Sequence, residues 1–278
     1  MSIKRILLPV HGRDDLSPVA ALAFTLARAF GGQVEGIFPQ SDAAATTAPG
    51  GVPTSAFAIK DLLDYAQKRA REAAEDAESA FATLAARFPE VDTAFVLPGA
   101  GVADMTARHA FSADLTVVGD RAHYHGDYWS EAREGALFMS GRPVLVAPSK
   151  PLPAKIGERV VIAWKDQAEA ARAVAGAMPF IEQAREVRLV TVEGGEEAHL
   201  SGERMRAYLE LHAPRVLFEQ LQREGDRVAD LLVRKAAAQE GTILVMGAYS
   251  RWRWRERIFG GVTDTMLREA KVPLLMAH

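Results

Sequence analysis

The sequence lacks cysteine throughout its 278 residues. This absence excludes disulfide bonds, thiolate nucleophiles and cysteine-based zinc or iron–sulfur sites. A cysteine-free chain suits a reducing compartment, and we expect a cytoplasmic protein. No apolar run approaches the roughly 18 residues of a membrane span, and the apolar run near the start is too short for a signal peptide. We therefore expect no membrane partner.

The chain also lacks a strong excess of charge of either sign. Lysine and arginine number 33 against 36 acidic residues, which gives a formal net charge of −3 and a pI near 6.2. This balance does not point to nucleic acid or an anionic membrane as a partner. With 49% hydrophobic and 25% charged residues, the chain has a globular composition and is long enough for two domains of ordinary size.

Short apolar runs alternate with helical patterns, and the whole pattern occurs twice, on either side of a proline-rich linker at residues 148–157. Such alternation implies a parallel sheet with helices on both faces and right-handed crossovers. We therefore predict an α/β fold with two doubly wound domains, residues 1–148 and 158–278. The predicted strands are 6–10, 33–38, 93–97, 114–119 and 143–147, then 159–164, 186–192, 215–221, 242–246 and 272–277, and the predicted helices are 16–30, 58–87, 102–110, 131–140, 166–180, 197–211, 226–238 and 261–270.

An insertion and the closing strands of the two halves each lead to a separate expectation. Residues 41–55 are rich in Ala, Thr, Pro and Gly without periodicity, so we expect an irregular, protease-sensitive insertion. The last strand of each half, 143–147 and 272–277, would expose unpaired backbone groups at a sheet edge. We expect these two strands to pair with each other and make an internal pseudo-dimer.

A phosphate cradle is predicted near the end of the chain. The fourth strand of the second half ends at Gly247, and Gly260-Gly261-Val262-Thr263 opens a helix. The N–H groups at a helix start have no intrahelical partner, the helix dipole favours negative charge there, and a glycine pair permits close approach. An ordinary loop turn explains the same residues, and this alternative stays open.

These features together resemble the universal stress protein family in its tandem two-domain form. The resemblance covers essentially the whole chain and lies in the opening strands at Ile6 and Val160, the helix start after Gly260, and the closing strands with Pro143 and Pro273. It implies a flavodoxin-like (Rossmann-like) fold with five strands in the order 3-2-1-4-5 in each half, and a role in stress response. Family members often dimerise through the fifth strand, so a homodimer is also an expectation.

The resemblance further implies ATP or AMP as a ligand, because many members carry the motif G-x2-G-x9-G-[S/T]; others lack it and bind no nucleotide. Gly247 and Gly260 match its first and third glycines. Ser250 stands at the second glycine and Gly261 at the hydroxyl position, while Thr263 supplies a hydroxyl two residues later. The match is therefore partial, and one phosphate donor is missing.

The strand-one aspartate of the family is also replaced. Lys165 occupies its position in the second half, with Asp166 one place later, and His11 occupies it in the first half. The first half has no glycine–hydroxyl helix start either, around Gly135. We therefore expect a binding site in the second half only, and a non-binding copy in the first.

We expect an adenine nucleotide over the carboxyl ends of the second sheet, between its first and fourth strands, where the winding direction reverses. We expect adenosine to contact Ala163, Trp164 and Val192. We expect the phosphates to contact Gly260, Gly261, Val262 and Thr263, with positive charge from Lys165 or Arg251. Gly247 and Ser250 complete the motif positions.

Two other groups of residues carry weaker hypotheses. Residues 251–257 interleave arginine and tryptophan, which could stack a base, although a loop packed on its own domain explains them as well. His123, His125 and Asp127 could bind a metal, but no fourth ligand is evident. The neighbouring Tyr124, Tyr128 and Trp129 are expected to cover the edge of the sheet.

Three functions follow from these observations. The first is a regulatory stress-response protein that binds ATP or another adenine nucleotide in its second half. The second is a nucleotide-independent scaffold for an unknown protein partner, with a decayed site. The third is a slow nucleotide hydrolase, which we rank last because no base or metal carboxylate is placed for hydrolysis; we do not expect an enzyme.

Overall fold

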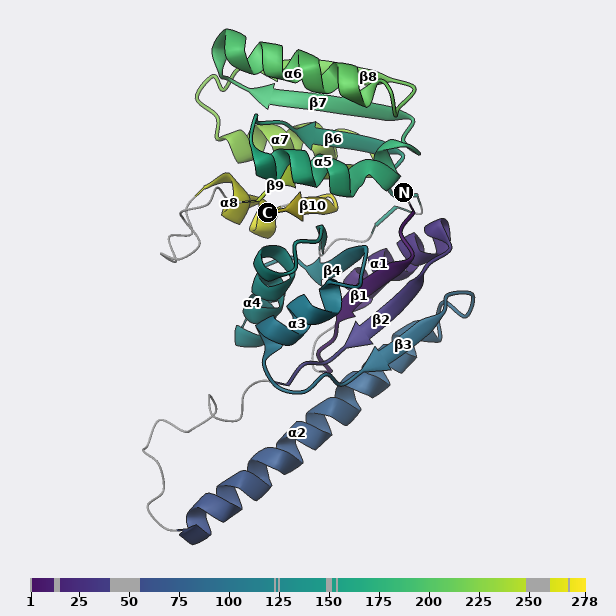
Figure 1. Ribbon diagram of the computed structural model, residues 1–278, viewed down its shortest axis with the longest axis vertical. Helices are drawn as coiled ribbons and strands as arrows, with labels where there is room; N and C mark the ends of the chain where they lie inside the picture. The colour runs from purple at the N-terminus through teal and green to yellow at the C-terminus, as the bar shows by residue number, and fades with distance from the viewer. Residues whose placement is uncertain are drawn as a thin grey trace.

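One ten-stranded sheet runs through the whole computed structural model, with helices on both faces (Figure 1). The structure describes residues 2–12, 16–40, 56–122, 124, 126–148, 152–153, 155–248, 261–269 and 271–278. Among these residues, no helix has both the length and the apolar character that crossing a membrane requires.

Each half contributes five strands and the helices between them. The first half contains β1 (Arg5–Pro9), α1 (Ser17–Phe30), β2 (Gln33–Ile37), α2 (Ala56–Ala85), β3 (Thr93–Val96), α3 (Val102–Ala110), β4 (Leu115–Gly119), α4 (Asp127–Glu134), the π-helical turn η2 (Gly135–Met139) and β5 (Val144–Ala147). The second half contains β6 (Arg159–Ala163), α5 (Ala168–Ile181), β7 (Glu186–Val192), α6 (Gly195–Leu209), β8 (Val216–Leu221), α7 (Val228–Ala237), β9 (Thr242–Gly247), α8 (Val262–Glu269) and β10 (Leu274–Ala277).

The strand order of the sheet is β3-β2-β1-β4-β5-β10-β9-β6-β7-β8. Within each half every strand pair is parallel. Each half therefore shows the predicted order 3-2-1-4-5, and the predicted flavodoxin-like fold is confirmed. The two five-stranded sheets are joined edge to edge into a single sheet.

The junction between the halves is the pair β5–β10. These strands run antiparallel, with Leu274 opposite Val146 and Met276 opposite Val144. Helices α1 and α5 meet over the junction, where the rings of Phe30 and Phe180 lie perpendicular with centroids 5.4 Å apart. The pairing satisfies the backbone groups of both strands, which would otherwise form exposed edges.

The central strands are buried on both faces, which explains their continuous apolar sequence. In β9, Ile243 and Val245 pack in the cluster that contains α1 and α5, whereas Leu244 and Met246 pack in the cluster that contains α7 and α8. Successive side chains of a strand point to opposite faces, so every position of such a run has a partner.

The helix before β5 begins earlier than the sequence predicts. It was expected at 131–140, but α4 starts at Asp127 and continues into η2. Gly135 lies where these two segments meet, and a Cβ there would be 2.1 Å from the carbonyl oxygen of Ala103. The glycine therefore lets this helix pack closely against α3, a tertiary contact that local sequence does not reveal.

Helix α2 is the longest element of the described chain, and its first turns extend away from the body (Figure 1). Its last turns pack through Ala77, Phe81 and Leu84, whereas Tyr65 is 62% exposed. The insertion expected at 41–55 lies outside the described residues.

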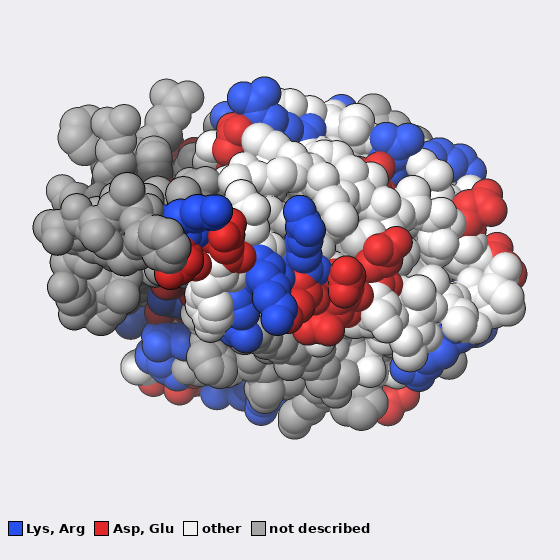
Figure 2. Space-filling model, turned by 90° about the horizontal axis from the view of Figure 1, so that it is seen from below, with Lys and Arg blue, Asp and Glu red and all other residues white. Residues whose placement is uncertain are grey.

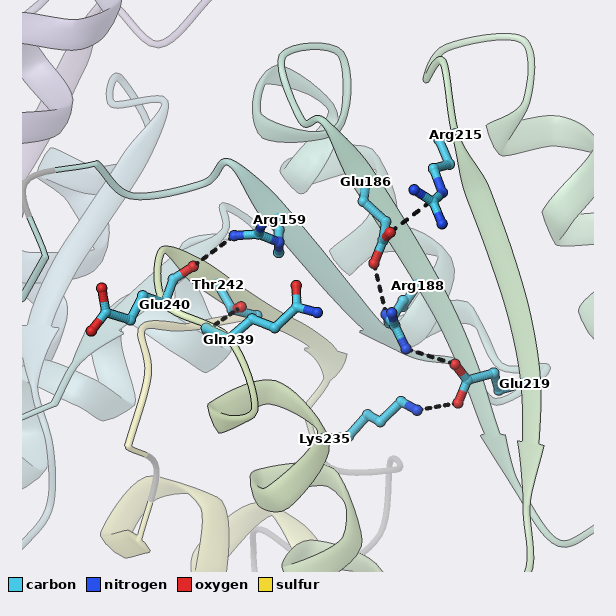
Figure 3. A network of polar contacts seen from close by, with 9 residues as sticks. All are labelled: Arg159, Glu186, Arg188, Arg215, Glu219, Lys235, Gln239, Glu240 and Thr242. Atoms are coloured by element: carbon cyan, nitrogen blue, oxygen red, sulfur yellow. Dashed lines mark hydrogen bonds and ion pairs between the residues drawn. The ribbon is translucent and has the colours of Figure 1, made fainter.

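A network of charged side chains links β7, β8 and α7 in the second half (Figure 3). Arg188 donates to Glu186 at 2.8 Å and to Glu219 at 2.9 Å. Lys235 of α7 also pairs with Glu219, and Arg215 pairs with Glu186 at 3.4 Å. Glu186 and Arg188 lie near the amino end of β7, so this network leaves the carboxyl end of the strand to other residues.

The view from below in Figure 2 shows acidic and basic side chains interspersed over the described surface, without a continuous field of one sign. A protein that tracks a polyanion presents such a field. This face of the described chain agrees with the near balance of charges in the sequence.

Candidate functional site

A cavity of about 610 Å³ lies over the carboxyl ends of β6, β7 and β9 in the second half. Its walls also come from the first turns of α5, α6, α7 and α8. The sheet continues from β6 to β7 on one side and to β9 on the other, so the cavity lies where the winding direction reverses. In open α/β sheets this is the position at which ligands bind, and the volume suits a small molecule.

The structure gathers most of the predicted site residues around this cavity. Those that line it are Ala163, Trp164, Lys165, Val192, Gly247, Gly261, Val262 and Thr263. The other predicted residues, Ser250, Arg251 and Gly260, lie outside the described residues, as do His123, His125 and the arginine–tryptophan loop at 251–257.

Trp164 and Thr191 form a largely buried part of the wall. The Trp164 indole donates to Ser201 Oγ at 2.9 Å, and its backbone N–H donates to Val190 O at 2.8 Å, so its ring is held firmly. Thr191 is only 3% exposed, and its hydroxyl has no hydrogen-bond partner within the described residues. A buried hydroxyl without a partner is costly, and this one belongs to a residue of the cavity wall.

Gly247 permits the close approach of β9 to the start of α5. A Cβ at this position would lie 2.6 Å from the backbone nitrogen of Ala170 and 2.8 Å from the carbonyl carbon of Glu169. Both neighbours are backbone atoms, which cannot move aside cheaply. The first glycine of the predicted motif therefore has a packing role in addition to its place in the cavity wall.

The start of α8 closes one end of the cavity. Gly261 has a φ of 150°, and a Cβ there would meet no atom within 4 Å of the described structure. L side chains rarely adopt this conformation, which explains glycine at the position where the family motif carries a hydroxyl. Val262 and Thr263 follow in the first helical turn and line the cavity, with N–H groups available to an anion.

The charges around the cavity are uneven. Lys165 is accompanied by carboxylates at the starts of α5 and α6. Asp166 pairs with Arg204 at 3.2 Å, and Glu193 pairs with Arg223 at 3.9 Å, whereas Glu169 is buried in the wall. Since carboxylates repel phosphate, the described walls favour an anionic group at the α8 end.

Sequence reasoning missed several of these wall residues. Thr191, Glu169 and Ser201 were not predicted, although all three line the cavity. Thr191 lies one residue before the predicted Val192, and strand geometry could have indicated that both reach the carboxyl end of β7. Ser201 carries no such signal, because only the packing of α6 brings it to Trp164.

The family assignment rests on the second half. A sequence model of the Universal stress protein family matches residues 164–278. The second half is a universal stress protein domain. The first half repeats the strand order of this universal stress protein domain, so the chain has a tandem arrangement. No curated protein matches the chain significantly.

Solved structures resemble both halves together. A universal stress protein from Archaeoglobus fulgidus DSM 4304 shares 14% identity at a TM-score of 0.62, over 98% of this chain and 97% of its own. A functionally unknown protein from Pseudomonas aeruginosa PAO1 shares 12% at 0.57, over 99% and 92%. The cytoplasmic domain of a prokaryotic cation chloride cotransporter shares 11% at 0.51, over 99% and 96%. At these identities the likeness shows the fold alone.

The equivalent position in the first half is filled by its own side chains. Val10 donates to Ile37 O at 2.8 Å, as Trp164 does to Val190 O, which makes His11 the counterpart of Lys165 and Phe38 that of Thr191. The His11 ring lies 4.9 Å from that of Tyr128 and 6.1 Å from that of Phe38, measured between centroids.

The α4 segment completes this aromatic cluster. The Tyr128 hydroxyl donates to Val10 O at 2.7 Å, and the Trp129 ring packs perpendicular to Tyr128. The Tyr124 ring lies directly over Gly119, where a Cβ would be 1.8 Å from it. The expectation that Tyr124, Tyr128 and Trp129 cover a sheet edge is therefore wrong, because they are buried over the carboxyl ends of the first-half strands.

Proposed function

We propose that this protein is a stress-response regulator whose second half binds ATP or another adenine nucleotide in the cavity over β6 and β9. The observation that carries the proposal is the combination of the cavity, the accessible start of α8 and the buried Thr191 hydroxyl in one wall. The family assignment of residues 164–278 agrees with it.

The proposed pose follows the walls. Adenosine lies near Ala163, Trp164 and Val192, beside Thr191. The phosphates lie at the other end, against the N–H groups of Gly261 and Val262 and beside Thr263. Lys165 supplies positive charge from the cavity wall.

Calorimetric titration of ATP, ADP and AMP tests the proposal. The sharpest variant is Thr191→Val, which removes the hydroxyl and keeps the shape. The variant removes a buried hydroxyl that has no partner, so the free energy of unfolding should rise by about 1 kcal/mol. Nucleotide affinity should instead fall about fivefold to tenfold.

Thr116→Val is the matched control. The Thr116 hydroxyl of β4 is also buried without a partner in the described structure, but it lies in the first half. This control should gain similar stability and bind nucleotide as the wild type does. No binding by the wild type at millimolar nucleotide would end the proposal.

A nucleotide-independent scaffold for a protein partner is the second candidate. It is favoured by α2, whose first turns extend from the body (Figure 1) and in which Tyr65 is exposed. This candidate would be supported if the wild type binds no nucleotide but binds a protein partner, and if that binding is lost when α2 is shortened. A slow nucleotide hydrolase ranks below both, because no observation favours one of the wall carboxylates as a catalytic base.

A further inference from the structure

Arg121, in the first half, reaches the helix that closes the cavity of the second half. It lies two residues after the end of β4, and its backbone N–H donates to Leu267 O of α8 at 2.8 Å. Its guanidinium forms an ion pair with Asp264 Oδ1. This contact is separate from the β5–β10 junction, so the halves also meet at the start of α8.

Asp264 links the contact to the charge at the start of α8. It follows Thr263 in the first turn of α8 and is only 2% exposed. Arg268 donates to its second oxygen at 2.5 Å. A buried carboxylate is stable only when it is paired, and an unbalanced one at this position would repel phosphate at the adjacent helix start.

The segment that carries Arg121 is itself fixed. The backbone N–H of Asp120 donates to Ala147 O of β5 at 3.1 Å, and that of Tyr124 donates to Asp120 O at 3.1 Å. Arg133 donates to Tyr124 O at 2.7 Å. Burial, and then the charge of Arg121, lowers the pKa of Arg133 to about 10. The same anchored segment therefore carries Tyr124, which covers Gly119 in the first half, and Arg121, which contacts α8.

We propose that Arg121 is a positioning residue for the anion-binding end of the second-half cavity: it holds the first turn of α8 and balances the charge of Asp264. This inference rests on the proposed nucleotide site and adds that the first half tunes it. The affinity for a ligand with phosphate should depend on the ion pair between Arg121 and Asp264, whereas the affinity for a neutral nucleoside should not.

Calorimetry with ATP and with adenosine tests the electrostatic part. Arg121→Gln should weaken ATP binding about tenfold and change adenosine binding less than about twofold. The double variant Arg121→Gln/Asp264→Asn should restore ATP affinity to within about threefold of wild type, because removing one charge of each sign restores the net charge of the group formed by Arg121, Asp264 and Arg268. Equal losses for ATP and adenosine, or no rescue by the second substitution, would overturn the charge-balancing role.

Amide hydrogen exchange of residues 262–269 without ligand tests the positioning part independently of any nucleotide. Arg121→Gln should speed exchange in α8 about tenfold, while Arg108→Gln should not, since Arg108 pairs with Asp104 on an exposed face of α3. Unchanged exchange in Arg121→Gln would overturn the inference. Wild type without nucleotide binding would instead contradict the proposed function, and the exchange result would still decide whether the first half holds α8.

Discussion

The two halves share one strand order but differ at the carboxyl ends of their strands. Phe38 stands where the second half has Thr191, and the Tyr124 ring covers Gly119 where Gly247 borders a cavity. A few side chains therefore decide whether the crevice of this fold is filled by the protein or left to a ligand. The comparison shows that function resides in the site rather than in the fold.

The largest expected effect is on stability and comes from removing Trp129 from the aromatic cluster of the first half, whose crevice is filled by side chains. Trp129→Ala deletes a ring that is 2% exposed and should lower the free energy of unfolding by about 3–5 kcal/mol. Urea denaturation measures this loss. Tyr65→Ala on exposed α2 is the control and should change stability by less than about 0.5 kcal/mol. Similar small losses in both variants would show that the aromatic cluster is not a packed core.

The next effect comes from converting the second half into a copy of the first. Thr191→Phe places a ring where Phe38 lies, so it should fill the cavity and lower nucleotide affinity at least about a hundredfold, roughly 2.7 kcal/mol. The ring buries apolar area in the cavity, which offsets part of the overpacking at this buried position, so stability should fall by no more than about 1–3 kcal/mol. Calorimetry and thermal unfolding measure the two quantities together. Full nucleotide binding by this folded variant would place the ligand outside the cavity.

A third variant sharpens the comparison at the helix start. Gly260→Asp adds bulk and negative charge where an anion should bind, and affinity should drop about tenfold to a hundredfold, or 1.5–3 kcal/mol. Thr263→Ala should weaken binding less, because the backbone donors of α8 remain. Titration of ATP into both variants checks this order. Wild-type affinity in Gly260→Asp would move the phosphates elsewhere.

The smallest effect concerns a single hydrogen bond of the filled half. Tyr128→Phe removes the hydroxyl that donates to Val10 O and should cost about 1 kcal/mol of stability. Nucleotide binding in the second half should stay at the wild-type value. Chemical denaturation provides the measurement, and a loss of binding in this variant would mean that the two crevices are coupled.

The fold could be predicted because its signals are local. Continuous apolar runs such as 242–246 mark strands buried on both faces, and their repetition indicated the two halves, whereas the strand order was implied by the family resemblance. The strand ends and the helix start around the cavity were predictable for the same reason, as Trp164, Gly247 and Thr263 show. Positions tied to regular elements carry their own periodicity.

The parts that were not predicted depend on contacts between distant segments. Residues 127–130 continue a loop-like, polar and aromatic sequence, but the Tyr128 hydroxyl bonds to Val10 O and Gly135 packs against Ala103, and these residues form the first turn of α4. The bond from Trp164 to Ser201 likewise needs α6 in place. No periodicity in the sequence reports such partners, so tertiary packing overrides the local signal.

The antiparallel junction of β5 with β10 has a consequence for how the protein can change. In a symmetric homodimer built on that junction, every substitution appears in both crevices at once, so a ring that fills one fills the other. Within a single chain each crevice is encoded separately. Substitutions can therefore fill the crevice of one half while the other half keeps its cavity, and selection can act on the two halves independently.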